Sequence, residues 1–379
     1  MSTLAASARL LDRLPLVPPG VLVDEERARA NIAGMAAKAA ASGVRLRPHV
    51  KTHDNVGVGR WFREAGVACA TVSSLAMAER FAADGWTDLT LAVLVNPREL
   101  PRLADLAWRL AERGGALGLV VDTPEAARAV RHVAGDTAAL WIKVDTGYGR
   151  SGIPWNDAER LRRVAESAAC TGLLTHAGHS YQAAPAALPA LFAETAAHLA
   201  AARTATERPG LLLSVGDTPT CTAVERFDGV DEVRPGNFVF YDLMQRAARV
   251  CGDEQLAAGL ACPVLAIDTA RHRLVLHGGA VHLSKEALPG AAGPVFGYLG
   301  VLTPAGFGPV LTEAPVTAVS QEHGIVTIDP AHWDDLTDGL RTGDAVLVFP
   351  VHACLTCNLH DTMATTTGRL LARDAGGSR

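Results

Sequence analysis

Between about Val21 and Ala261, short apolar segments alternate with longer segments rich in Ala, Leu and Arg that have the periodicity of amphipathic helices. The apolar segments are continuous, which is typical of parallel strands buried on both faces. Repeated strand and helix units of this kind predict an α/β fold, specifically a (β/α)8 barrel. The predicted strands are 43–46, 68–72, 89–94, 116–121 and 139–144, and the predicted helices are 24–41, 75–84, 97–113 and 124–133.

After about Cys262 the pattern changes to short strands and turns, with little helical periodicity. This pattern predicts a C-terminal antiparallel β domain. We place the barrel at residues 21–255 and the β domain at residues 256–379, with a disordered tail from Ala372 onward. The predicted strands of this domain are 264–267, 273–276, 310–311, 316–319, 324–328 and 345–349.

Charge and composition exclude several classes of partner. The 379 residues include 35 basic and 40 acidic side chains, dispersed to a net charge of -5, which gives no case for nucleic acid or an anionic membrane. No apolar run approaches the roughly 20 residues of a membrane span, and the N-terminal segment lacks the apolar core of a secretory signal. Seven cysteines, most within apolar runs, indicate reduced thiols. We therefore expect a cytoplasmic protein that binds a small molecule.

The segment PHVKTH, residues 48–53, ends the strand predicted at 43–46. Catalytic groups of such barrels gather at the C-terminal ends of the strands. Lys51 lies there between two histidines with no adjacent carboxylate, which suits an amine that must lose a proton to form an imine. An ordinary surface lysine is the alternative that this segment alone leaves open.

Gly-rich and hydroxyl-rich loops follow later strands of the predicted barrel. The loop 145–152 offers glycines that let backbone approach a ligand and an arginine, Arg150, that can donate to an oxyanion. The segments 214–220 and 233–237 offer hydroxyls and glycine amides near the last strands, where barrels commonly hold a phosphate. Because no nucleotide fingerprint is present, the phosphate is expected to belong to another kind of molecule. Plain βα turns are the alternative for these loops.

A group of metal-ligating residue types occurs at 350–361, PVHACLTCNLHD. If this segment is a strand, His352 and Cys354 point the same way and can hold one divalent ion, with zinc the natural choice. Two alternatives remain open at this point: ordinary buried residues, or a ligand pair made by Cys357 and His360.

Seven segments in this order resemble the D-threonine aldolase and D-serine dehydratase family of pyridoxal-phosphate enzymes, in the alanine-racemase-like class. They are PHVKTH, VDTGYGRSG, THAGHSY, SVGDTPT, EVRPGNFVFYD, SQEHG and PVHACLTCNLHD. The resemblance implies a pyridoxal-phosphate barrel followed by a β domain, to which residues 1–20 contribute a strand. It also implies a homodimer, because active sites of this class form near a dimer interface.

The resemblance assigns cofactor contacts to individual residues. Lys51 matches the Schiff-base lysine, Arg150 the arginine near the phenolic oxygen of the cofactor, and His176 the histidine beside the pyridine ring. Arg234 resembles the arginine that faces the pyridine nitrogen in alanine racemases. The residues that look like the phosphate cup are Gly216, Thr218, Gly236, Asn237 and Tyr241.

Proton carriers are assigned less directly. His53, His179 and Tyr181 are the candidates, and Tyr181 is also counted among the cofactor contacts. Each of the three fits a supporting or packing role equally well.

The metal pair of the family is a histidine followed two residues later by cysteine or aspartate, and His352 with Cys354 fits the cysteine form that we associate with dehydratases. Zinc is the expected metal, with Mn²⁺ or Mg²⁺ as alternatives. The expected reaction is elimination from a D-β-hydroxy amino acid, such as D-serine, D-threonine or 3-hydroxy-D-aspartate, to a 2-oxo acid and ammonia. The alternatives are an aldolase that gives glycine and an aldehyde, a racemase, and a non-catalytic cofactor binder. The segment 277–285 departs from the acidic Asp-Ala-Gly pattern of typical D-serine dehydratases.

Overall fold

A computed structural model describes residues 2–374. The chain divides into two compact units. The barrel unit consists of residues 33–51 and 59–238, and the β unit consists of the other described residues. Residues 21–32, 52–58 and 239–255, which the sequence prediction counted with the barrel, lie in the β unit. The two units are defined by how compactly their residues pack, which does not test whether each part folds independently. The domain ranges predicted from the sequence therefore stay a proposal.

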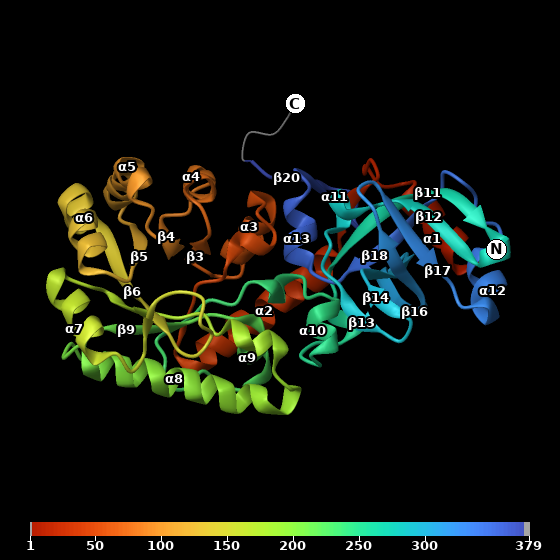
Figure 1. The fold of residues 1–379 in the computed structure, drawn as a ribbon. Helices are drawn as coiled ribbons and strands as arrows, with labels where there is room; N and C mark the ends of the chain where they lie inside the picture. The colour runs from red at the N-terminus through yellow and green to blue at the C-terminus, as the bar shows by residue number, and fades with distance from the viewer. Residues whose placement is uncertain (1, 375–379) are drawn as a thin grey trace. The chain divides into compact units, whose positions relative to one another are not determined.

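The barrel unit is built on eight parallel strands, as predicted (Figure 1). Their order is β2 (Arg45–Leu46), β10 (Glu232–Val233), β9 (Leu212–Val215), β8 (Gly172–Leu174), β6 (Ala138–Asp145), β5 (Ala116–Val121), β4 (Asp88–Leu94) and β3 (Cys69–Val72), with β7 (Ile153–Pro154) beside β6. A parallel bridge between His49 and Thr71 joins the two ends of this order. The strands therefore form a nearly closed barrel, and their continuous apolar runs are buried as expected.

Helices alternate with these strands, and polar side chains fix where several of them begin. They are α2 (Glu25–Ser42), α3 (Val56–Glu64), α4 (Leu75–Ala83), α5 (Leu100–Glu112), α6 (Pro124–Ala134), α7 (Ala158–Ser167), α8 (Leu188–Ala205) and α9 (Thr218–Ala223). Figure 1 shows α4, α5 and α6 outside the strands β3 to β5. Ser74, Thr123 and Asp157 each accept a hydrogen bond from a backbone N–H of the helix that follows.

One predicted helix, 97–113, is split in the structure. Residues Pro97–Glu99 form a 3-10 turn, and α5 begins at Leu100. The physical reason is Pro101, which has no N–H to donate and is therefore tolerated in the first turn of an α-helix but not in its interior.

The β unit contains a nine-stranded, mostly antiparallel sheet. Its order is β12 (Arg273–His277), β17 (His323–Thr327), β16 (Gly306–Val319), β15 (Gly297–Thr303), β18 (Ala345–Pro350), β11 (Ala258–Asp268), β1 (Gly20–Val23), β19 (Thr362–Thr365) and β20 (Leu370–Ala372). β12 also pairs with β11, so six of the strands close on themselves. The unit also holds α1 (Thr3–Leu11), α10 (Leu243–Ala247), α11 (Ala280–Leu283), β13 (Leu288–Gly290), β14 (Gly293–Val295), α12 (Trp333–Thr337) and α13 (Ala353–Asn358).

The ends of the described chain differ from expectation. Residues 3–11 form a helix, and within the described residues 2–20 only Gly20, which begins β1, lies in a strand. β1 is fully buried and pairs with β11 and β19, so its apolar run fills the sheet of the β unit and not the barrel. Ala372 ends β20, and Arg373 pairs with Asp54, so the predicted disorder does not apply to residues 372–374. Residues 375–379 of the predicted tail lie outside the described residues.

Within residues 2–374, no helix combines the length and the apolar character that crossing a bilayer requires.

Candidate active site

Lys51 lies in the 3-10 turn Val50–Thr52 that follows β2, at the C-terminal end of the strand, and it is exposed. Its backbone N–H points to Nδ1 of His49 at 3.5 Å. His49 is half-buried, and burial of its ring together with the positive charges of Lys51 and Arg234 keeps the pKa of its imidazole well below the ordinary range. The predicted lysine therefore stands at the position where a barrel presents catalytic groups, next to a neutral imidazole.

His176 follows β8 in the same unit. Its Nδ1 lies 2.5 Å from the backbone oxygen of Gly216, so Nδ1 donates. Burial lowers the pKa of His176 to about 3; the hydrogen bond to Gly216 opposes this shift, and the nearby charge of Lys51 adds to it by a smaller amount. The ring meets Tyr148 edge-on at 5.7 Å between centroids. His176 is thus a fixed, neutral ring, as a residue beside an aromatic cofactor should be.

The Gly-rich loop after β6 is held by one carboxylate. Oδ1 of Asp145 accepts hydrogen bonds from the backbone N–H groups of Gly147, Tyr148 and Gly149 at 2.9 to 3.1 Å. Gly147 and Gly149 have φ of 127° and 77°, a region that glycine occupies without strain. The guanidinium of Arg150 lies over the Tyr148 ring at 5.2 Å, so the loop presents a cation at a defined place.

Positive charge accumulates in the barrel unit around this loop. Lys143 is buried on β6, and burial with the charges of Arg234 and Arg150 lowers its pKa to about 7. Arg234 is buried too, and its guanidinium donates to Ser214 and to the backbone oxygen of Thr175. Burial lowers the pKa of Arg234 to about 10, so it stays charged at neutral pH. Sequence reasoning missed Lys143, although it directly precedes the segment VDTGYGRSG, which contains Arg150.

The residues predicted to hold a phosphate come partly together. Gly216 follows β9, and a Cβ on it would lie 3.1 Å from Arg234, so only glycine fits there without displacement. Oγ1 of Thr218, at the start of α9, accepts from the backbone N–H of Gly236 at 3.3 Å. Asn237 is buried one residue further along. Tyr241, in contrast, belongs to the β unit, where it is buried with φ of 45°.

These residues fit pyridoxal phosphate. The cofactor carries an anionic phosphate and a phenolic oxygen on an aromatic ring. The barrel unit offers several buried or fixed cations, backbone amides that glycine leaves accessible, and a neutral imidazole ring. The charges of Arg234 and Arg150 lower the pKa of Lys143, and the carboxylate of Asp145 opposes them with a smaller effect. An anionic ligand would balance this concentration of positive charge.

The three predicted proton carriers lie in different settings. His179 and Tyr181 stand on the 3-10 segment Gly178–Gln182 of the barrel unit. Nδ1 of His179 is buried and meets no hydrogen-bond partner among residues 2–374. His53 lies in the β unit, where its Nδ1 is 2.9 Å from the backbone oxygen of Asn55, and burial lowers its pKa to about 3.

The predicted metal pair lies at the N-terminus of α13, not on a strand. The expectation of a strand was wrong because β18 ends at Pro350 and the chain then turns into the helix, with extended His352 as its N-cap. The backbone N–H of Ala353 donates to Oδ2 of Asp242 at 2.9 Å, which fixes the first turn. The side chains of His352 and Cys354 nevertheless meet in a hydrogen bond.

The donors fit a divalent metal. Burial alone lowers the pKa of His352, but the hydrogen bond to Cys354 and the negative charge of Asp242 and Glu286 outweigh it and raise that pKa to about 9. Nδ1 of His352 is buried without a hydrogen-bond partner among the described residues. An imidazole nitrogen and a thiol held in contact, with carboxylates nearby, are borderline ligands that suit zinc. For the alternative pair, Cys357 is buried and Nε2 of His360 lies 3.0 Å from the backbone oxygen of His282.

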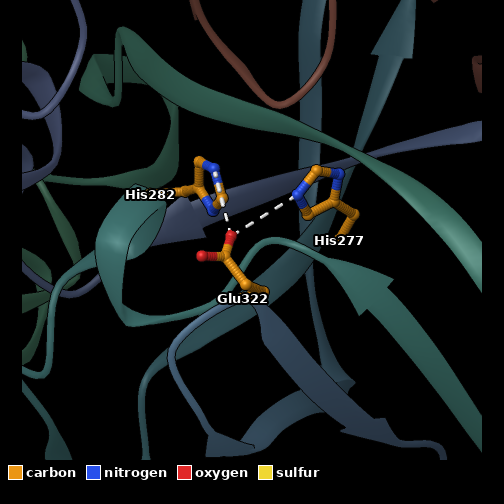
Figure 2. Close-up of side chains that lie close together, drawn as sticks. All are labelled: His277, His282 and Glu322. Atoms are coloured by element: carbon orange, nitrogen blue, oxygen red, sulfur yellow. Dashed lines mark ion pairs between the residues drawn. The ribbon is translucent and has the colours of Figure 1, made fainter.

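A second group of ligating side chains gathers in the β unit (Figure 2). His277, His282 and Glu322 each offer one ligand atom, and these atoms lie within 4.8 Å of one another. The sequence contains both contributing segments, 277–285 and SQEHG, but nothing in it indicated that they meet.

Two family models match successive parts of the chain. Residues 23–243 match the family model described as alanine racemase, N-terminal domain, and residues 257–366 match the model described as "Putative serine dehydratase domain". The chain is 36% identical over 356 residues to D-threo-3-hydroxyaspartate dehydratase of Delftia sp., covering 90% of this chain and 92% of that protein. It is 28% identical over 360 residues to D-threonine aldolase of Arthrobacter sp., covering 90% and 87%.

The fold agrees with a solved structure of the same kind of enzyme. A cysteine-to-alanine mutant of D-threo-3-hydroxyaspartate dehydratase in the metal-free form superposes with a TM-score of 0.85 at 33% identity, covering 96% of this chain and 98% of that one. Barrel, β unit and cation-rich strand ends thus define an alanine-racemase-like pyridoxal-phosphate enzyme. The chain belongs to the alanine racemase N-terminal domain family, as a lyase related to its dehydratases and aldolases, which confirms the resemblance seen in the sequence.

Proposed function

We propose that the chain is a pyridoxal-phosphate- and metal-dependent dehydratase that converts a D-β-hydroxy amino acid to a 2-oxo acid and ammonia. The dehydratase of Delftia sp., similar over nearly its whole length, supports this reaction. The observation that carries the proposal is the contact of the Cys354 thiol with Oγ1 of Thr52 at 3.2 Å. Thr52 directly follows Lys51 in the chain. The thiol therefore contacts the residue next to the lysine that we propose to carry the cofactor.

Bound pyridoxal phosphate supplies an electron sink for Cα, and a bound divalent metal supplies a Lewis acid for the β-hydroxyl. Lys51 is proposed to carry the cofactor and to remove the α-proton when the substrate amine replaces it. His176, held neutral, is proposed to lie beside the cofactor ring, and Arg150 near its phenolic oxygen. Arg234, which stays charged, is proposed to face the ring nitrogen and so to disfavour its protonation.

The phosphate is proposed to lie on Gly216, Thr218, Gly236 and Asn237, with Tyr241 as a further contact. Glycine amides and a hydroxyl at the start of a helix are donors that suit a phosphate. His179 and Tyr181 are proposed as proton carriers, with Tyr181 also contacting the cofactor, because they share a segment next to the ring of His176; the ring centroids of His176 and Tyr181 are 6.4 Å apart. His53 stays a third candidate, and its burial favours a supporting role.

His352 and Cys354 are proposed to hold the metal. Zinc is the first choice because the pair combines imidazole and thiol, and Mn²⁺ or Mg²⁺ are the alternatives. Two protein ligands leave positions for the substrate hydroxyl and for water. The side chains of His352 and Cys354 are in place before any metal binds, because their mutual hydrogen bond brings the two donor atoms together.

For the substrate we propose 3-hydroxy-D-aspartate first, since the relative of highest identity named above acts on a 3-hydroxyaspartate, and D-serine or D-threonine after it. A homodimer and a cytoplasmic location are also proposed. Support for the location comes from the cysteines, because all seven are free thiols, as in a reducing compartment.

An aldolase reaction is the second candidate, since D-threonine aldolase of Arthrobacter sp. is also similar over most of its length. Racemisation is disfavoured because it does not require a metal. A non-catalytic cofactor binder is disfavoured because the serine dehydratase domain match accounts for the second part of the chain.

The test is a product assay on the protein supplied with pyridoxal phosphate and Zn²⁺. Each D-β-hydroxy amino acid is incubated separately, and 2-oxo acid, ammonia, glycine and aldehyde are measured. We expect 2-oxo acid and ammonia in equal amounts, abolished by Lys51→Ala and unchanged by Lys285→Ala, which removes an exposed lysine. Glycine with aldehyde as the products would replace the dehydratase by the aldolase.

A further inference from the structure

The cluster of His277, His282 and Glu322 lies on three different elements of the β unit. His277 ends β12, His282 stands in α11, and Glu322 lies in the turn between β16 and β17. Nε2 of His277 is 3.7 Å from Oε2 of Glu322, and Nε2 of His282 is 4.0 Å from the same oxygen. Figure 2 shows both rings directed at this one carboxylate.

The backbone holds these elements together without help from the side chains. The N–H groups of Gly278 and Gly279 both donate to the backbone oxygen of Glu322 at 3.0 Å, and Ala280 donates to Ser320 at 2.8 Å. A Cβ on Gly279 would lie 2.5 Å from the backbone of residues 321–323. Glycine is therefore required for this approach, and it sets the ligand atoms close before any ion binds.

The spacing is near that of a metal centre. Tetrahedral zinc with bonds of about 2.0 to 2.1 Å places its ligand atoms about 3.4 Å apart. Since the ligand atoms of the cluster lie within 4.8 Å of one another, they need to close by no more than about 1.4 Å. Side-chain exposures of 39% for His277 and 47% for Glu322 leave room for that rotation and for entry of an ion.

The donor set matches a known kind of site. Two imidazoles and one carboxylate, with a fourth position left for water, are ligands that zinc and cobalt accept. Nδ1 of His282 is buried and has no hydrogen-bond partner within residues 2–374. No donor to Nδ1 therefore forces the ring proton onto Nε2, and Nε2 is available as a metal ligand. Oε1 of Glu322 accepts from the side chain of Gln321 at 3.4 Å, which leaves Oε2 for the rings.

We propose that His277, His282 and Glu322 form a second divalent-metal site, separate from His352 and Cys354. The backbone oxygens of His282 and Leu283 accept from the side chains of His360 and Thr356, at 3.0 and 2.9 Å. Thr356 belongs to α13, the helix that carries Cys354. A metal bound to the cluster therefore stabilises α11, and through these hydrogen bonds it also stabilises α13, the helix of the proposed catalytic metal.

The experiment titrates Co²⁺, followed by its visible absorption, into metal-stripped protein whose first site is removed by Cys354→Ala. We expect one equivalent to bind. Adding Glu322→Gln, which keeps the shape of the side chain, weakens binding on the order of 100-fold, since loss of even a supporting hydrogen bond costs 10- to 100-fold. Adding His332→Ala instead, an exposed histidine of the same unit, leaves binding unchanged.

Failure of Cys354→Ala to bind Co²⁺ at millimolar concentration overturns the proposal, as does binding that Glu322→Gln does not weaken. If Cys354→Ala does not fold, bound zinc is counted in the unsubstituted protein and in two single variants. Glu322→Gln must bind one equivalent less than the unsubstituted protein, and His332→Ala must bind the same amount. Because no substrate is used, an incorrect assignment of the dehydratase reaction leaves these results unaffected.

Discussion

Lys143 offers a test of the charge distribution in the barrel unit. It is buried on β6, and burial with the charges of Arg234 and Arg150 lowers its pKa from an ordinary 10.5 to about 7. Methionine has nearly the same length without the charge, and it keeps the Cγ atom of the side chain. We therefore expect Lys143→Met to stabilise the protein when no anionic ligand is bound.

The size of the effect follows from the linkage between protonation and folding. One pKa unit corresponds to about 1.4 kcal/mol, so a pKa of about 7 against 10.5 destabilises the folded state by about 4 kcal/mol at pH 7 and about 2 kcal/mol at pH 9. The sign follows from proton binding: between pH 7 and pH 10.5 the unfolded chain binds more protons than the folded chain. The stability of the unsubstituted protein therefore rises with pH over this window.

The assay is urea unfolding of both proteins at pH 7 and pH 9 after pyridoxal phosphate is removed. The advantage of Lys143→Met is expected to shrink by about 2 kcal/mol between the two pH values. Comparing the same variant at two pH values cancels packing effects that do not titrate. An advantage of equal size at both pH values, or none at either, refutes the assignment of Lys143 as a buried, destabilising cation.

Three further changes probe other parts of the molecule. Glu232→Gln breaks the buried ion pair of Glu232 with Arg47, at 2.7 Å, and should cost about 3 to 5 kcal/mol in urea unfolding; a cost near zero would show that the pair is not needed. Gly279→Ala forces a Cβ to within 2.5 Å of the backbone before β17, and it should lower both Tm and Co²⁺ affinity of the second site; an unchanged Tm would contradict the close approach. Asp242→Ala removes the acceptor for the first turn of α13 and should weaken zinc binding about 10- to 100-fold. Asp157→Ala, which also removes a helix cap, is its control and should leave zinc binding unchanged.

Much of the fold could be predicted because apolar runs carry it. The strand 116–121 was predicted with the bounds that β5 has, since a parallel strand buried on both faces is a continuous apolar run. Segments 310–311 and 316–319, predicted separately, form one strand, β16. Its register shifts where it pairs with β15, so the interruption at Pro315 appears as a bulge and not as a turn.

The site was harder to predict where its geometry depends on contacts distant in sequence. His352 and Cys354 were expected to meet because they would lie two apart on a strand, but they lie at the start of a helix whose first turn depends on Asp242, more than a hundred residues earlier. The cluster of His277 and Glu322 depends on the pairing of β12 with β17, which a single sequence does not reveal. The low pKa of Lys143 likewise depends on which way its strand turns the side chain.

The central claim is that Lys51 carries pyridoxal phosphate. Its most direct test is to reconstitute the protein with the cofactor, reduce it with borohydride to fix any covalent bond between the two, and locate the modified lysine by peptide mass spectrometry. The account predicts that the phosphopyridoxyl group is on Lys51. Modification of Lys143 or of another lysine in its place, or of none, would contradict it.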